Sequence, residues 1–234
     1  MIRSALILAR KDLTLICLRG SGLAQALLLG LLLIFIFSLA RGVAETFSAQ
    51  AAATVFWVST LFCQVLIFNA LYALEEDNGQ RQALLLIPAP VQCVWLGKAL
   101  AGLVLLLAAQ AFFAPALLVF LEQSLVGQPH QILGLLLLVN IGLVAAGSLL
   151  GAIAQGRAAK ESLLSLILFP LLLPLLLAAI RLGAGMLSAS VAMPGLPVQS
   201  AFDTGAWFKI LIGFDCIFAA AGLVLFPFIY SASE

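Results

Sequence analysis

The sequence predicts an all-α integral membrane protein with six transmembrane helices, and three observations lead to this prediction. Of its 234 residues, 64% are hydrophobic and only 9% are charged, whereas a soluble domain carries about 25% charged residues. So few charges cannot cover a water-facing surface, and lipid must therefore cover much of the chain. Several apolar stretches also reach the about 20 residues that a helix needs to cross the hydrocarbon layer.

Six apolar stretches are long enough to be spans, and we expect them to form a single permease domain over residues 1–234. Backbone polar groups in lipid must be satisfied internally, and the stretches show no alternation of apolar and polar residues. Helices are therefore expected rather than a barrel. The predicted spans are residues 22–40, 54–74, 94–121, 131–154, 163–181 and 208–230.

Residues 1–21 precede the first span and predict a helix that lies along the membrane interface. One face has apolar residues at a spacing of three to four: Ile2, Leu6, Ala9, Leu13 and Ile16. Another face gathers Arg3, Arg10, Lys11 and Thr14. This two-sided pattern is typical of interfacial helices. A plain cytoplasmic extension of the first span is the alternative.

The distribution of Lys and Arg predicts that both termini are cytoplasmic. With the N-terminus inside, the cytoplasmic segments hold Arg3, Arg10, Lys11, Arg19, Arg81, Lys98, Arg157 and Lys160. The outer segments hold Arg41, Arg181 and Lys209. Cytoplasmic loops carry the excess of positive residues in membrane proteins, and eight against three follows that rule.

The turn after the second span has the densest cluster of acids in the chain: Glu75, Glu76 and Asp77. Asn78-Gly79 suits a tight turn or the end of a helix. Residues 80–87 can then form a short helix along the membrane that ends before Pro88. Such a helix is the shape by which a membrane subunit receives force from a soluble motor. A polar loop kept inside by topology alone is the alternative.

Two local patterns in the fourth and fifth spans bear on packing. Gly147 and Gly151 lie four residues apart, a spacing that lets two helices approach closely; the partner is either another copy or this same chain.

Pro170 and Pro174 each remove a backbone donor, so the fifth span is expected to bend or partly unwind. Such breaks line transport pathways in some proteins and are tolerated in ordinary transmembrane helices in others.

Asp215 is the clearest charged residue at bilayer depth, about two turns into the sixth span. An intramembrane acid indicates a functional site by default. The alternative is that it lies near the outer interface or pairs with Lys209. His130 is the only histidine and falls in a predicted outer loop, where we expect it to be solvated.

Several function classes are excluded by what the sequence lacks. No basic run is present to neutralise phosphates, so nucleic-acid binding is not expected. The four cysteines form no CxxC pattern, which argues against a metal site or a disulfide framework. No GxSxG, HExxH or GxxxxGK[ST] motif occurs, so the chain is not expected to be an enzyme or to hydrolyse ATP by itself.

Four stretches, in order, resemble a known family. They are "ALILARKDLTL", "LEEDNGQRQALLLIPAPVQCVWLGKAL", "GSLLGAIAQGRAAKESLLSLILFPLLLPLLL" and "WFKILIGFDCIF". Together they resemble the CcmB family, the permeases of the cytochrome c biogenesis haem exporter, among the six-span permeases of ABC exporters. The acidic stretch reads Glu-Glu-Asp-Asn-Gly, where many relatives read closer to Asp-Asp-x-x-Asp-Gly.

The resemblance implies a homodimeric subunit of a complex in the bacterial inner membrane. Its partners would be an ATP-binding subunit (protein A), a haem-handling membrane protein (protein C), a small tether (protein D) and a haem chaperone (protein E). ATP would bind the partner subunit, and haem would be cargo of the complex, ligated by protein C. This chain itself is expected to bind no cofactor.

The resemblance also implies roles for particular residues. The region that docks the ATPase would comprise Glu75, Glu76, Asp77, Gly79 and Pro88. Arg10 and Asp12 would belong to the interfacial helix beside it. Arg157, Lys160 and Glu161 would lie on the second cytoplasmic loop, within reach of the same partner. Two alternatives are an ABC permease for another hydrophobic substrate and a membrane scaffold that only transmits ATPase motion.

Overall fold

A computed structural model describes residues 2–40, 42, 47–76, 90–153, 158–189 and 204–231 of the chain. In these residues the order of elements is α1 (Ile2–Arg19), α2 (Ser21–Leu39), α3 (Ala49–Glu76), α5 (Gln92–Phe120), β1 (Gln123–Leu125), α6 (Pro129–Ile153), α7 (Ala158–Ala184), β2 (Leu187–Ala189) and α8 (Thr204–Ser231). The protein is therefore built almost entirely of helices, as predicted.

Five of the described helices are long and apolar enough to cross a membrane, which makes the protein a multi-pass membrane protein. These candidate spans are Gly22–Leu39, Ala49–Leu74, Gln92–Phe120, Pro129–Ile153 and Thr204–Ile229. They match the first four predicted spans and the sixth. The predicted span at 163–181 falls within α7, of which the shorter apolar part Pro170–Ala184 is described in full.

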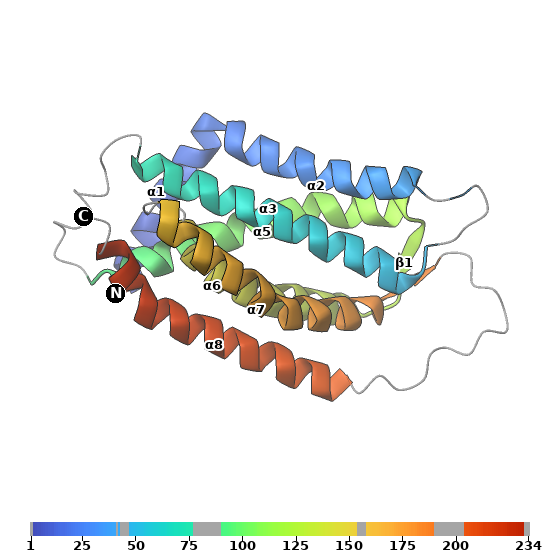
Figure 1. The fold of residues 1–234 in the computed structure, drawn as a ribbon. Helices are drawn as coiled ribbons and strands as arrows, with labels where there is room; N and C mark the ends of the chain where they lie inside the picture. Colours follow the sequence, from blue (N-terminus) through green and yellow to red (C-terminus); the bar gives the residue numbers. More distant parts are fainter. Residues whose placement is uncertain are drawn as a thin grey trace.

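Six of the described helices run side by side along a bundle, and α1 crosses one end of it (Figure 1). α3 and α6 form the centre, with α2 packed on α3 and α5, and α8 packed on α6 and α7. α1 begins and α8 ends at the same end, which we call the α1 end (Figure 1). Strands β1 and β2 lie at the opposite end, which we call the strand end.

The chain turns sharply between α1 and α2 at Gly20. Its φ of 62° lies in the left-handed region, which glycine adopts without steric cost. The Gly20 N–H still donates to the Ile16 carbonyl oxygen at 2.8 Å, so α1 is capped as it ends. This turn lets α1 leave the direction of the bundle and lie across it.

α1 does not bury the apolar stripe that the sequence predicts. Ala9 and Ile16 of that stripe pack inward, but Ile2 and Leu6 are exposed. The buried face instead includes Asp12, which is 2% exposed. The helix is rotated in this way because Asp12 has a charged partner inside the bundle.

The two short strands were not expected from the sequence, which predicts only helices and loops. β1 and β2 pair antiparallel, with Gln123 opposite Ala189 and Leu125 opposite Leu187. The Val126 N–H extends the pairing to the Met186 carbonyl oxygen at 3.0 Å. The pairing ties the α5–α6 connection to the end of α7, a long-range contact that no local pattern indicates.

α7 continues as an α-helix through Pro170 and Pro174. The predicted partial unwinding is therefore not found. Pro170 is exposed at the surface of the chain.

Candidate functional site

Lys98, near the start of α5 at the α1 end, is a buried charged residue with several partners. Its side chain is only 1% exposed, although it is a lysine in an apolar bundle. The residue before it, Gly97, allows α1 to lie directly over α5. A Cβ atom at Gly97 would come within 2.9 Å of the Leu8 Cβ atom and 3.1 Å of the Ala5 carbonyl oxygen. The same close approach covers Lys98 and removes it from solvent.

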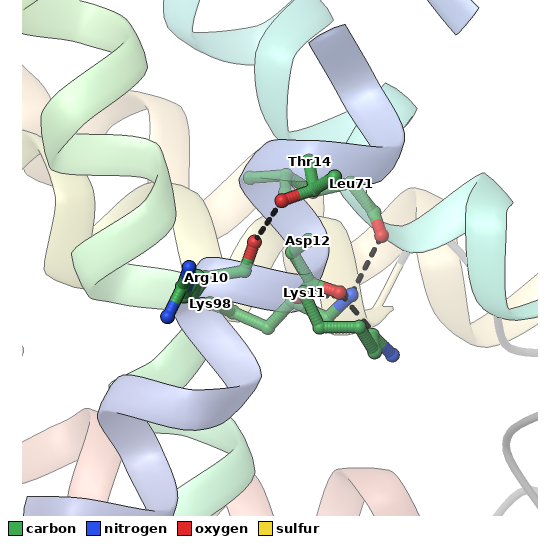
Figure 2. Close-up of polar contacts among 6 residues, drawn as sticks. All are labelled: Arg10, Lys11, Asp12, Thr14, Leu71 and Lys98. Carbon is green, nitrogen blue, oxygen red and sulfur yellow. Dashed lines mark hydrogen bonds and ion pairs between the residues drawn. The ribbon is translucent and has the colours of Figure 1, made fainter. Parts of the chain in front are cut away.

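Three described groups lie close to the Lys98 ammonium, and Figure 2 shows two of them, Asp12 and Leu71. Its Nζ atom lies 3.1 Å from Oδ2 of Asp12 on α1 and donates to the Leu71 carbonyl oxygen on α3 at 2.7 Å. It also lies 5.1 Å from the centroid of the Tyr72 ring, where a cation is attracted to the ring face. Lys98 thereby joins α1, α3 and α5 at one point.

The Asp12 carboxylate has a second cation beside it. Lys11 Nζ lies 3.3 Å from Asp12 Oδ1, and its side chain is 35% exposed (Figure 2). Burying a charge is costly unless it is paired and hydrogen-bonded. Asp12 and Lys98 are paired with each other, and Lys98 also donates a hydrogen bond to Leu71, whereas Asp12 Oδ1 has no hydrogen-bond partner among the described residues.

Gly147 and Gly151 on α6 pack against α3 of the same chain. A Cβ atom at Gly147 would lie 2.6 Å from the Phe68 ring, and one at Gly151 would lie 2.5 Å from the Tyr72 ring. Of the two partners that the sequence allows for this pair, the structure shows the intramolecular one. Because glycine has no side chain, the Phe68 and Tyr72 rings have room to lie against α6 at these two positions.

A substitution in this contact is expected to destabilise the protein. Gly147→Val forces the Phe68 ring to move and is expected to lower the free energy of unfolding by about 1–3 kcal/mol, the usual cost of overpacking. Gly134→Val is the matched control, because Gly134 lies on the same helix with no atom within 4 Å of its Cβ position. Thermal unfolding in detergent measures both; equal midpoints would contradict the described packing.

Polar side chains inside the bundle link its central helices by hydrogen bonds. None of these side chains is among the site residues predicted above. Gln110 on α5 and Asn140 on α6 exchange two hydrogen bonds, of 2.9 and 2.7 Å. Tyr72 donates to the Ser148 carbonyl oxygen at 2.8 Å, and Gln64 Nε2 donates to the Leu143 carbonyl oxygen. Their only signal in the sequence is that polar residues interrupt apolar spans, where interhelical hydrogen bonds stabilise packing.

Comparison with known sequences identifies the family. The profile of the family described as "CcmB protein" matches residues 3–233. The chain belongs to the CcmB family. This CcmB chain is also 29% identical over 198 residues to "Heme exporter protein B" of Pseudomonas aeruginosa, an alignment that covers 82% of this chain and 83% of the relative. The resemblance found in the four sequence stretches is thereby confirmed.

Of the eight residues that the family resemblance assigns to ATPase docking, four fall outside the described part of this CcmB chain. Asp77, Gly79, Pro88 and Arg157 lie outside the described residues. Glu75 and Glu76 belong to the last turn of α3 by their backbone. Lys160 and Glu161 belong in the same way to the first turn of α7. The two helix ends that carry them both lie at the α1 end (Figure 1).

The interfacial-helix residues of the CcmB chain occupy different environments. Arg10 is exposed, and its carbonyl oxygen accepts a hydrogen bond of 2.8 Å from Thr14 Oγ1 (Figure 2). Asp12 faces the bundle and pairs with Lys98, as described above. Arg10 is therefore open to a partner at the surface, whereas Asp12 acts within the chain.

Asp215 lies inside a candidate span of the CcmB chain and is 7% exposed. Its carboxylate fits against Gly142 of α6, where a Cβ atom would collide with Oδ1. Neither oxygen has a hydrogen-bond partner among the described residues. In that part of the structure no ion pair joins it to the exposed Lys209. Among the described residues the Lys209 pair is therefore not found, and the intramembrane placement stays a prediction.

Two hollows lie at the strand end of the CcmB chain. An apolar cavity of about 80 Å³ is lined by residues including Phe56, Trp57 and Met186. This volume is well below the about 300 Å³ of a typical ligand pocket. An open groove of about 450 Å³ lies between α2 and α3 beside Phe37 and Gln50. Its described lining contains no His, Cys, Met or Tyr, the side chains that ligate haem iron.

Proposed function

We propose that this CcmB protein is the transmembrane permease subunit of an ABC-type haem exporter that serves cytochrome c maturation in the bacterial inner membrane. The observation that carries the proposal is the family match over residues 3–233. The relative named as a heme exporter protein supports the cargo. In this proposal the chain is a transport subunit rather than an enzyme, and a partner subunit binds and hydrolyses ATP.

The proposed topology has six spans, with both termini in the cytoplasm and α1 along the inner membrane surface. α7 supplies the remaining span, since its 27 residues are enough to cross the hydrocarbon. The start of α1 and the end of α8 at one end of the bundle support an even number of crossings (Figure 1). The transverse position of α1 and its exposed Ile2 and Leu6 support an interfacial helix.

ATP hydrolysis would act on this subunit through the acidic turn after α3. Closure of two ATPase subunits moves the segments that dock on them, and the bundle then changes between two states. The acids Glu75, Glu76 and Asp77 can pair with Arg or Lys on the ATPase. Lys160 and Glu161, at the start of α7, would touch the same partner at the same end of the bundle.

The proposed complex contains a homodimer of this chain with proteins A, C and D, and it delivers haem to, or releases, the periplasmic chaperone protein E. The chain itself would hold no cofactor, and protein C would ligate haem. This division of roles is supported by the lining of the open groove, whose described residues offer no ligand for iron. His130, the only histidine, is exposed at the start of α6.

The same groove lining favours a second candidate, a scaffold that moves no haem and transmits ATPase motion to protein C. Binding of haem by this subunit, purified without protein C, distinguishes the two. A stable haem absorption band in that preparation would contradict the scaffold. An ABC permease for another hydrophobic substrate remains the third hypothesis, and it predicts altered lipid or drug export with intact c-type cytochromes.

Deleting the gene for this chain tests the proposed function directly. Because haem delivery should stop, c-type cytochromes are expected to lose their covalent haem. Haem staining of membrane proteins after denaturing electrophoresis measures this, and a plasmid copy of the gene is expected to restore the staining. Normal covalent haem in the deletion strain would contradict the proposal.

A further inference from the structure

Lys98 is placed where three parts of the chain around the acidic turn meet. Leu71, whose carbonyl oxygen accepts its hydrogen bond, lies one helix turn before Glu75. Lys98 itself lies on the helix that follows residues 77–89. Lys98, on the helix after this segment, therefore contacts α3, the helix before it. Asp12 adds α1 as the third part.

These contacts resist separation because their charges are buried. Lys98 and Asp12 are 1% and 2% exposed. Pulling α1 away from α5 would break this ion pair together with the close packing that covers it. The close contact of Gly97 with Leu8 and Ala5 adds packing beside the ion pair. α1, the end of α3 and the start of α5 are thus held as one unit.

We propose that Lys98 and Asp12 are a positioning pair that fixes α1 to both flanks of the ATPase-docking segment, so that movement of this segment carries α1 and the bundle together. The inference rests on the proposed function, since it assumes that an ATPase moves residues 77–89. Lys98 and Asp12 touch neither cargo nor nucleotide in this role. They act by keeping the moving elements joined.

The test replaces the ion pair with apolar side chains. It thereby separates an effect on the attachment of α1 from an effect on the folding of the chain. Buried ion pairs replaced by apolar residues of similar volume often keep or gain stability. In the complete complex, Asp12→Leu/Lys98→Met is therefore expected to retain co-purification with the ATPase subunit and its ATP hydrolysis. Covalent haem in c-type cytochromes should fall by at least about five-fold, the lower range of a typical coupling between sites. Arg3→Met, an exposed charge on α1, is the matched control and should change none of the three.

The outcomes distinguish this inference from the function on which it rests. Full cytochrome maturation by the Asp12→Leu/Lys98→Met variant overturns the positioning role and leaves the proposed function intact. A wild-type chain that does not co-purify with any ATPase subunit overturns the proposed function instead. Loss of ATPase binding in the double variant also overturns the inference, because the pair would then be part of docking.

A second measurement keeps the natural ion pair and so does not depend on the variant folding. Spin labels are placed on α1 and α3 by Leu18→Cys and Ala73→Cys, both at exposed positions, after the exposed Cys17 and Cys216 are replaced by Ser. The distance between the labels in the complex is expected to agree with and without ATP to within about 2 Å, the size of ordinary helix shifts. A larger change would show that α1 moves independently and would overturn the inference.

Discussion

Lys98→Met is expected to lower the free energy of unfolding of the protein by about 3–5 kcal/mol. The substitution removes the ammonium and leaves the buried Asp12 carboxylate with only the partly exposed Lys11 beside it, and breaking a buried ion pair carries a cost of this size. It also removes the donor to the Leu71 carbonyl oxygen, which lies 2.7 Å from Nζ. Unfolding of the purified protein in mixed detergent micelles measures the loss.

The chain provides a matched control for this prediction in Lys11, which pairs with the same carboxylate at 3.3 Å. Its side chain is 35% exposed, so water screens the interaction. Lys11→Met is therefore expected to cost no more than about 1 kcal/mol. Adding Asp12→Leu to Lys98→Met should recover most of the lost stability. Equal losses in the two lysine variants would show that burial does not set the strength of the pair.

Removing the charges of the acidic turn is expected to abolish coupling to the ATPase. The variant Glu75→Gln/Glu76→Gln/Asp77→Asn keeps the shape of the side chains but cannot pair with Arg or Lys. Loss of a buried interfacial charge pair costs about 2–5 kcal/mol, which weakens binding by roughly 30-fold to several thousand-fold. The ATPase subunit should no longer co-purify in detergent, while insertion into the membrane should be unchanged.

Glu122→Gln is the control for this variant, because Glu122 is an exposed acid at the strand end of the bundle. It should retain the ATPase subunit. The three single substitutions then show which acid carries the interaction. The docking role would be contradicted by unchanged co-purification. It would also fail if a labelled cysteine at position 79 were reachable only from outside the cell, since the ATPase lies inside.

The structure places several predicted residues as expected but gives some of them partners that the sequence does not indicate. Gly147 and Gly151 were identified as a close-packing pair, and the structure shows close packing, but the partner is α3 of the same chain. Asp215 was identified as an intramembrane acid, and it lies buried in a candidate span. Asp12 was placed on the interfacial helix, but its pairing with Lys98 was not expected.

The sequence by itself determined that this is a multi-pass helical membrane protein of the CcmB family. Both conclusions depend on local features: the length of apolar stretches, which the bilayer thickness demands, and short motifs in a fixed order. Three other features follow only from the fold: the buried face of α1, the contacts of Gly147 and Gly151, and the pairing of β1 with β2. These depend on contacts between residues far apart in the chain. A periodic pattern in one helix cannot reveal them, because the energy of burying Asp12 is set by a lysine 86 residues later.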